Sequence, residues 1–475
     1  MNGSPLAQLD SFPYRHRLGE VMTSPAVSVP GRLTLGEAAE RMDALNISSV
    51  LVEGETTGIV TERDVLRAVS RHGRDALGLP LTAVMSAPVH SLPEGSYVYL
   101  ALGRMDRLGV RHLAVTGGDG RVVGIVTARQ LLRQRVGKAL VLGDQLAVAL
   151  DAADMGAVHR ALPTLARSLL VERVPALDVA GVLSQMLRDL TARAAELAAA
   201  ELGPAPASWC VLVLGSAGRG ETLLAGDQDN ALLHAGSPDD DPWFAEFGHR
   251  LNALLDAAEV PLCKGGVMAG NPAWRHDVAG WRRLIDHWVG AARPQDLLEV
   301  DMFFDAHAVC GDQALAAGLR AYAMERAGGS LGFLKNLAAQ LDTVQPPLDL
   351  LGRFRTEEGR VDLKVGGAWP VVTAARVLAI RHGIAATGTA ARLAELAAAG
   401  HLNETDAAGL AELHADCLAL MLEQQIADVE AGRSPSPLVD VRRLDRLRSR
   451  RLREGLRRIR LIPDMVREGL SVAAA

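Results

Sequence analysis

The residues of this chain whose types and spacing best suit chemistry lie near its middle. An apolar run, Val211–Leu214, ends at Gly215 and Ser216, and eleven residues beyond Ser216 comes Asp227, followed by Asp229. Positions i and i+2 of a strand face the same side, so we expect the two carboxylates to converge. Paired carboxylates repel each other unless a divalent cation neutralises them, and Mg²⁺ prefers carboxylate and phosphate oxygens. The spacing therefore predicts a magnesium site.

The Gly-Ser turn before these carboxylates is a candidate phosphate site. A turn that leads into a helix presents backbone N–H groups to a polyphosphate, and Arg219 adds a cation in the same turn. Gly-rich turns and D-x-D pairs each also occur on ordinary surface loops and edge strands. Turn, spacer and D-x-D in this order, between two apolar strands, instead indicate in-line attack on the α-phosphate of a nucleoside triphosphate.

The elements that must position these groups can be inferred from the flanking sequence. Amphipathic helices precede the segment, and LGPAPAS ends them. Beyond the second apolar strand (230–233) we expect a helix at 243–258 and then a strand at 260–270, which carries no acid and has Lys264 in a Gly-rich turn. Asp301 and Asp305 are the next acids that could supply a third metal ligand. For Asp305 a structural role is the leading interpretation, with metal ligation as the alternative.

An internal repeat occupies the N-terminal quarter. EVMTSPAVSVP returns as AVMSAPVHSLP, and GIVTERD (58–64) returns as GIVTARQ (124–130), each within a βαββα order. This repeat resembles a tandem pair of CBS (cystathionine-β-synthase) modules over residues 17–137, at about 17–75 and 80–137, after a tail at 1–16. The resemblance implies two half-domains that cover each other's sheets and that could join two chains as a homodimer.

The resemblance also implies an adenosine-nucleotide site, for AMP or ATP. In CBS modules a Thr and an Asp after the second strand of each copy hold the ribose. The first copy has both, as Thr61 and Asp64, whereas the second has Thr127 with Gln130 in place of the acid. A carboxylate makes the stronger, charge-assisted bonds to ribose hydroxyls. We therefore expect at most one complete site, in the first copy, with a ligand-free structural module as the alternative.

The central segment resembles the nucleotidyltransferase superfamily of DNA polymerase β type. GSAGRGE and DQDNALL are closest to the nucleotidyltransferase domain that often follows CBS modules in bacteria, which is similar to the N-terminal catalytic domain of protein-PII uridylyltransferases. The resemblance implies phosphate binding at Gly215, Ser216 and Arg219 and Mg²⁺ at the two aspartates. Gly226 departs from the pattern, because these proteins commonly carry Ser or Thr there.

The remaining sequence is mostly helical and resembles the substrate-binding domain that accompanies this transferase. We expect a multidomain α+β protein with the transferase domain at 138–315 and a helical bundle at 330–470. Lys364, in VDLKVGG, is a candidate contact to the acceptor or the triphosphate by resemblance alone. Trp274 and Trp281 are expected to pack, with base stacking at Trp274 left open. The ten arginines of 442–460 follow helical spacing with leucines, which favours a solvated basic face on a packed helix.

Composition narrows the function classes. Lysine and arginine number 50 against 56 aspartates and glutamates, so the net charge of −6 argues against bulk attraction to nucleic acid or an anionic membrane. The four cysteines show no metal or disulfide spacing, which favours a reducing cytosol. The N-terminus lacks the apolar core of a signal peptide, and no apolar stretch is long enough to span a bilayer.

Together these patterns predict a cytoplasmic, Mg²⁺-dependent nucleotidyltransferase regulated by adenine nucleotide at the CBS pair. It would transfer NMP from an NTP to an acceptor, and a protein hydroxyl is the acceptor that the PII resemblance suggests. The alternative is a non-catalytic adenine-nucleotide sensor that signals by binding a partner.

Overall fold

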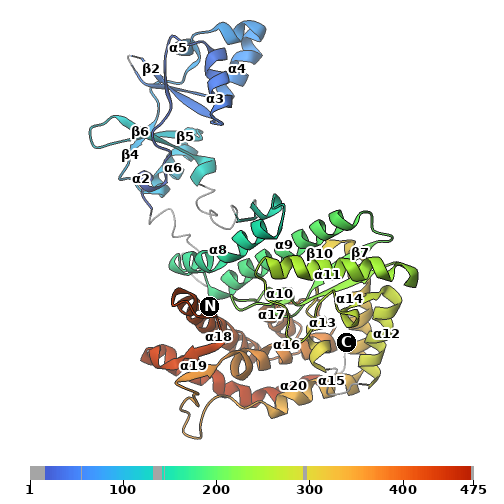
Figure 1. Cartoon of the computed structure of the whole chain (residues 1–475). Helices are drawn as coiled ribbons and strands as arrows, with labels where there is room; N and C mark the ends of the chain where they lie inside the picture. The colour runs from blue at the N-terminus through green and yellow to red at the C-terminus, as the bar shows by residue number, and fades with distance from the viewer. Residues whose placement is uncertain (1–15, 55, 132–141, 144, 292–296, 472–475) are drawn as a thin grey trace. The chain divides into compact units, whose positions relative to one another are not determined.

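The computed structural model describes residues 16–54, 56–131, 142–143, 145–291 and 297–471. The chain divides into two compact units, residues 1–140 and 141–475 (Figure 1). The tail expected at 1–16 lies outside the described residues except for His16, as does the end of the second repeat beyond Leu131.

The first unit contains the two repeats, which share one topology. In each, the first strand runs parallel to the second and the second antiparallel to the third. The first copy consists of β1 (Ser28–Pro30), α3 (Leu35–Ala44), β2 (Ser49–Glu53), β3 (Gly58–Thr61) and α4 (Glu62–His72). The second consists of β4 (Ser91–Pro93), α6 (Val98–Leu108), β5 (His112–Thr116) and β6 (Val122–Thr127). The predicted repeat is confirmed.

The two copies exchange their leading segments. Helix α2 (Leu18–Val21) precedes the first copy, yet Leu18 and Val21 lie in the core of the second copy. Helix α5 (Leu81–Val84) precedes the second copy, yet Leu81 lies in the core of the first. Neither half-domain is complete without the other, so the sequence boundary between 75 and 80 does not separate two folding units.

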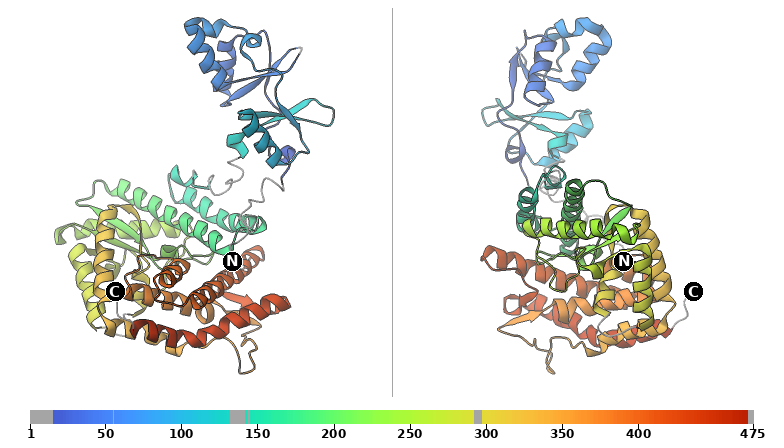
Figure 2. Two further views of the ribbon diagram at one scale, coloured as in Figure 1. Left: turned by 180° about the vertical axis from the view of Figure 1, so that it is seen from behind. Right: turned by 45° about the vertical axis from the view of Figure 1, so that its right-hand side comes forward.

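The second unit is built around a four-stranded sheet in the order β10-β7-β8-β9. Strands β7 and β8 are buried almost throughout, because their residues are nearly all apolar. Figure 2 shows helices covering the sheet. The strands are β7 (Trp209–Val213), β8 (Asn230–His234), β9 (Arg275–Asp277) and β10 (His307–Gly311). The helices of this part are α8 (Ala152–Val171), α9 (Ala176–Leu202), α10 (Gly215–Arg219), α11 (Asp241–Ala257), α12 (Val278–Ala291), α13 (Leu297–Phe303) and α14 (Gln313–Gly328).

The C-terminal region is helical, as predicted, but it shares one hydrophobic core with the sheet region. That core runs from Cys210 in β7 to Leu470 in the last helix, so the two regions form one compact unit. The helices are α15 (Leu331–Ala339), α16 (Trp369–Arg381), α17 (Thr389–Ala398), α18 (Glu404–Glu430), α19 (Arg446–Arg457) and α20 (Ile462–Ser471), with a short antiparallel pair of β11 (Arg360–Asp362) and β12 (Leu438–Asp440).

The strand expected at 260–270 is wrong, because this segment is a loop. Only an isolated bridge at Leu262 joins it to Gln228, and buried side chains bind its last part: Ala269 N–H donates to Asn230 Oδ1 at 2.8 Å, and Gly270 N–H donates to Asn252 Oδ1 at 2.8 Å. A positive φ of 72° at Gly266 also breaks the extended conformation. The sheet instead takes β9 as its edge strand.

The arginine-rich segment is a packed helix with a basic outer face, as predicted. Leu452 and Leu456 of α19 are buried, while Arg451 pairs with Asp416 at 2.6 Å. No helix in the described ranges is long and apolar enough to cross a membrane.

Candidate active site

The ends of β7 and β8 bring the Gly-Ser turn beside the aspartates. The two strands pair with Val213 opposite Asn230, and the next backbone contact is Leu214 N–H to the Asp229 carbonyl at 2.9 Å. Gly215 follows with φ of 56°, and a Cβ added there would lie 2.8 Å from Asp229 Oδ2. Glycine is therefore required at this position both by backbone conformation and by the close approach of the carboxylate.

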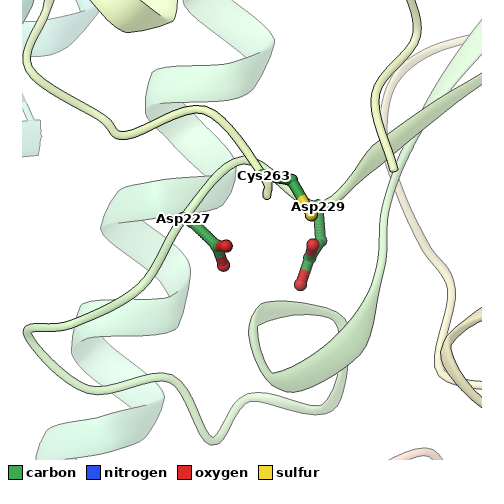
Figure 3. A group of neighbouring side chains, drawn as sticks. All are labelled: Asp227, Asp229 and Cys263. Atoms are coloured by element: carbon green, nitrogen blue, oxygen red, sulfur yellow. The ribbon is translucent and has the colours of Figure 1, made fainter. Parts of the chain in front are cut away.

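The alternation of an extended chain separates the metal-site residues from the core. Gln228 is 2 % exposed and donates from Nε2 to the carbonyls of Val260 and Asn252 at 2.9 and 3.2 Å. Asp227 and Asp229 consequently face the other side, and their carboxylates converge as predicted. One carboxylate oxygen of each and the Cys263 sulfur all lie within 4.8 Å of one another (Figure 3).

The electrostatics of the pair fit a bound cation. Burial, and next the charge of Asp227, raise the pKa of Asp229 to about 6. Burial also raises the pKa of Asp227, while Lys364 and Lys264 act in the opposite direction. Two partly buried carboxylates that repel each other, beside a glycine turn, are a suitable donor set for a divalent metal ion.

Cys263 is the member of this cluster that the sequence reasoning missed. Segment 260–270 contains no acid, and its loop instead places a thiol beside the two carboxylates. Burial, and next the charge of Asp229, raise the pKa of the Cys263 thiol to about 11. The thiol is therefore protonated near neutral pH and hydrogen-bonds with Asp229. Counting Cys as a metal ligand would have found it.

Asp305 is not a metal ligand in this structure, which corrects the alternative prediction of metal ligation. Its side chain is fully buried, and its carboxylate accepts from Arg219 at 2.5 Å, Arg376 at 2.6 Å and Arg392 at 2.8 Å. These three cations overcome the burial that opposes ionisation, so the pKa of Asp305 lies well below its usual range. A carboxylate already neutralised by three guanidinium groups has no charge left to offer a metal.

Arg219 is likewise turned away from the predicted phosphate site. Its Nε donates to Glu221 at 2.8 Å and its Nη1 to Asp305, and its side chain is only 12 % exposed. Asp301 lies in the same cluster, with its Oδ1 3.0 Å from Arg376 Nη1. It is therefore part of this ion-pair cluster and not of the Asp227–Asp229 pair. The helical region supplies Arg376 and Arg392, so this cluster ties it to the turn that follows β7.

Two cations replace Arg219 as candidates for the phosphate charge. The positive charges of Lys264 and Lys364 both lower the pKa of Asp227, and that of Lys364 also lowers the pKa of Asp229. Lys364 belongs to the helical region, so that region contributes a positive charge that lowers the pKa of both aspartates.

The loop between the turn and the aspartates is held from two sides. Helix α9 contributes Ser184, whose hydroxyl accepts from Thr222 N–H at 2.9 Å, and α18 contributes Gln425, whose Oε1 accepts from Leu224 N–H at 2.9 Å. A Cβ at Gly226 would lie 2.7 Å from Thr222 Oγ1. This close approach accounts for the glycine at position 226.

The tryptophans form part of the core. Trp274 and Trp281 are buried, and the Trp281 indole donates to the Leu232 carbonyl at 3.0 Å. Because both rings are buried in the core, neither is exposed to stack on a nucleotide base.

Gly215→Val should abolish NTP binding and also lower stability. The added side chain meets Asp229 Oδ2 and forces a β-branched residue into a positive φ, so the turn or the aspartate must move. We expect calorimetry to detect no NTP binding and the melting temperature to fall by several degrees. Gly318→Val on α14, where an added Cβ meets nothing within 4 Å, is the control for a general glycine effect. Unchanged NTP affinity in Gly215→Val would place the nucleotide elsewhere.

The first unit contains its own candidate site, a cavity of about 800 Å³. Its lining joins Thr127 and Gln130 of the second copy to Asp43, Ser48 and Glu62 of the first copy, and Thr23 also contributes to it. Arg129 also lines the cavity. The size and the mixture of hydroxyls, acids and a cation suit a nucleotide.

Thr61 and Asp64, the pair expected to form the complete ribose site, do not line this cavity. Asp64 accepts from Thr61 N–H at 3.0 Å and from the Thr61 hydroxyl at 2.7 Å, which caps α4. Gln130 takes the corresponding place in the second copy and donates to the Val21 carbonyl at 2.6 Å. The side chain of Gln130 thus hydrogen-bonds the second copy to the end of the exchanged helix α2. Thr127 remains in the lining of the cavity.

Comparison with protein families agrees with this architecture. Residues 160–295 match the family described as "Putative nucleotidyltransferase DUF294", and residues 332–469 match "Putative nucleotidyltransferase substrate binding domain". Residues 18–71 and 81–137 match the CBS domain. The chain therefore combines a CBS pair with a region of the DUF294 family, described as a putative nucleotidyltransferase, and a region of the matching substrate binding domain family.

The individual relatives match a quarter of the chain. An uncharacterized 17.7 kDa protein of Acidianus ambivalens is 32% identical over 120 residues, which cover 25% of this chain and 71% of that protein. An uncharacterized protein of Methanopyrus kandleri is 30% identical over 119 residues, 24% of this chain and 61% of that one. Among solved structures, a CBS-domain protein of Agrobacterium tumefaciens shares 26% identity over 25% of this chain and 98% of its own, with a TM-score of 0.24. A CBS protein of Pyrobaculum aerophilum complexed with AMP shares 24% identity over 26% and 98%, with a TM-score of 0.23.

Proposed function

We propose that this protein is a Mg²⁺-dependent nucleotidyltransferase that transfers NMP from an NTP to an acceptor and releases pyrophosphate. The observation that carries the proposal is the convergence of Asp227 and Asp229 beside the Gly215 turn, at the ends of two buried strands. This arrangement supports a metal and a triphosphate held next to each other. The family match supports the same reaction class.

The roles of the residues follow from their positions. Asp227 and Asp229 would hold Mg²⁺, which neutralises triphosphate charge and polarises the α-phosphate. Gly215 and Ser216 line the near side of that space with backbone, because no side chain at Gly215 fills it. Lys264 and Lys364 supply positive charge toward the aspartates and thus toward the phosphates. The acceptor hydroxyl attacks the α-phosphorus, and the bond to the pyrophosphate leaving group breaks.

The acceptor is proposed to be a protein hydroxyl, as in uridylylation of PII proteins. The support for this acceptor is the resemblance to protein-PII uridylyltransferases, together with the match of residues 332–469 to a substrate binding domain. The test is incubation of the purified chain with Mg²⁺, each α-³²P-labelled NTP and cell extract. Label on a protein band together with pyrophosphate release is expected. Labelling of no acceptor with any of the four nucleotides would overturn the transferase.

The CBS pair is proposed to bind AMP or ATP and to regulate transfer. Its support is the cavity at Thr127 and the CBS family match. A nucleotide there can change activity only through different affinities for two arrangements of the chain. The exposed apolar residues Leu66 and Val69 of α4, 71% and 44% exposed, support a further role of this unit in forming a homodimer. The same cavity favours the second candidate function, a nucleotide sensor without transferase activity.

Thr127→Val should weaken AMP binding about tenfold, because it removes one hydroxyl hydrogen bond without changing shape. Isothermal titration of AMP into the full chain is the measurement. Thr61→Val is the matched control at the equivalent position of the first copy, which does not line the cavity. Asp64→Ala should lower the melting temperature through loss of the α4 cap while retaining most of the affinity. If Asp64→Ala abolishes binding and Thr127→Val does not, the site belongs to the first copy.

A further inference from the structure

We propose that Cys263 completes, with Asp227 and Asp229, a three-ligand site for a thiophilic divalent cation, and that Zn²⁺ occupies it in competition with Mg²⁺. The inference rests on the proposed function only in taking Asp227 and Asp229 as the metal-binding carboxylates. It concerns which divalent cations bind at these residues, and it implies that Zn²⁺ inhibits the Mg²⁺-dependent transfer by displacing Mg²⁺.

The ligand atoms are close enough for one small ion. The Cys263 sulfur and one oxygen of each carboxylate lie within 4.8 Å of one another. In a tetrahedron with Zn–O bonds of about 2.1 Å and a Zn–S bond of about 2.3 Å, ligand atoms stand roughly 3.5 Å apart. Shifts of about an ångström shared among three side chains close the set, and solvent or a phosphate oxygen completes it.

The thiol is held in place by a well-supported loop. The residue before it, Leu262, forms a parallel bridge with Gln228, and Gln228 N–H donates to the Pro261 carbonyl at 2.9 Å. On the other side, Gly266 N–H donates to the Cys263 carbonyl at 3.0 Å and closes a tight turn. The buried Gln228 that separates the two aspartates therefore also fixes the loop that bears the sulfur, so the three ligands keep their relation to one another.

The donor set discriminates between metals. Mg²⁺ binds oxygen ligands and gains nothing from sulfur, so it uses the two carboxylates and leaves the thiol protonated. Zn²⁺, Co²⁺ and Cd²⁺ accept a thiolate, whose proton is released to solvent as the metal–sulfur bond forms. Such an ion occupies the place of Mg²⁺ with higher affinity. Micromolar zinc is then expected to inhibit an enzyme that works in millimolar magnesium.

The test uses the full chain and Co²⁺ as a spectroscopic probe of Zn²⁺ sites. Wild type should show a near-ultraviolet thiolate-to-cobalt charge-transfer band that Zn²⁺ abolishes, and titration calorimetry should give one site per chain. Cys263→Ser should lose the band and bind Zn²⁺ at least about tenfold more weakly, while its melting temperature without metal stays close to that of wild type. Cys310→Ser is the matched control, since Cys310 lies on β10 outside the cluster, and it should keep the band.

The outcomes separate this inference from the proposed function. Absence of the charge-transfer band in folded wild type, or its persistence in Cys263→Ser, overturns the three-ligand site. Persistence of the full Zn²⁺ affinity in Asp227→Asn also overturns it, because the carboxylates would then not share the ion. A cysteine-dependent band in a chain that transfers no nucleotide would support the metal site and refute the transferase alone.

Discussion

Asp227→Asn combined with Asp229→Asn is expected to abolish Mg²⁺-dependent NTP binding and reduce transfer by at least about a thousandfold. Loss of inner-sphere carboxylates removes several kcal/mol of transition-state stabilisation. The double variant should nevertheless melt at the wild-type temperature or slightly above it, because burial and mutual repulsion raise the pKa of Asp229 to about 6 in the native chain. Asparagine keeps the shape and removes that repulsion.

The measurements are calorimetry with NTP and Mg²⁺, pyrophosphate release, and a thermal melt of the same samples. Asp239→Asn, an exposed acid after β8, is the matched control for loss of a negative charge and should leave all three unchanged. Wild-type transfer by the double variant would refute the active-site assignment. Lost transfer with a much lower melting temperature would instead mean that the aspartates hold the fold together.

Asp305→Asn is expected to be among the most destabilising single substitutions in the second unit, by about 3–5 kcal/mol. The change leaves Arg219, Arg376 and Arg392 without their shared carboxylate, and the side chains of Arg376 and Arg392 are almost fully buried. The pKa of Asp305 is lowered in the folded chain, so its contribution is present above the unfolded value of about 3.9 and is lost only as pH falls toward the folded one.

The free energy of unfolding from urea denaturation is the measurement. Asp286→Asn, which breaks an exposed pair with Arg326 at 2.7 Å, is the matched control and should change it far less because water and salt screen surface pairs. Metal affinity supplies a second criterion. Folded Asp305→Asn should bind Mg²⁺ and NTP as wild type does, whereas a metal ligand would lose affinity in step with Asp229→Asn.

Much of the fold could be predicted from the local periodicity of apolar residues. The repeat of GIVT, the buried strands around Val211 and Asn230, and the i, i+2 convergence of the aspartates could all be read from the sequence, because each depends on neighbours within a few residues. The strand at 260–270 could not be read correctly. Its apolar residues fit a strand, but Asn230 and Asn252, distant in the chain, supply the hydrogen bonds that make it a loop.

The roles of charged residues were the least predictable. Arg219 and Asp305 looked like a phosphate ligand and a metal ligand because each stands near a motif in the sequence. The structure pairs them with each other, since Arg376 and Arg392 arrive from the helical region and make a buried cluster that is neutralised within itself. Which cation meets which carboxylate depends on packing between elements more than 70 residues apart.

The sequence by itself determined the CBS pair, the sheet strands, the helical C-terminal region and the aspartate pair, because these follow from patterns of apolar residues and from spacing along one strand. Tertiary structure alone decided three further matters. It exchanged α2 and α5 between the repeats, it placed the nucleotide-sized cavity at Thr127, and it brought Cys263 to Asp229. Each of these depends on contacts between segments that are far apart in the chain. Such segments come together because whole helices and strands are buried against one another, and the few residues in contact do not specify this by themselves.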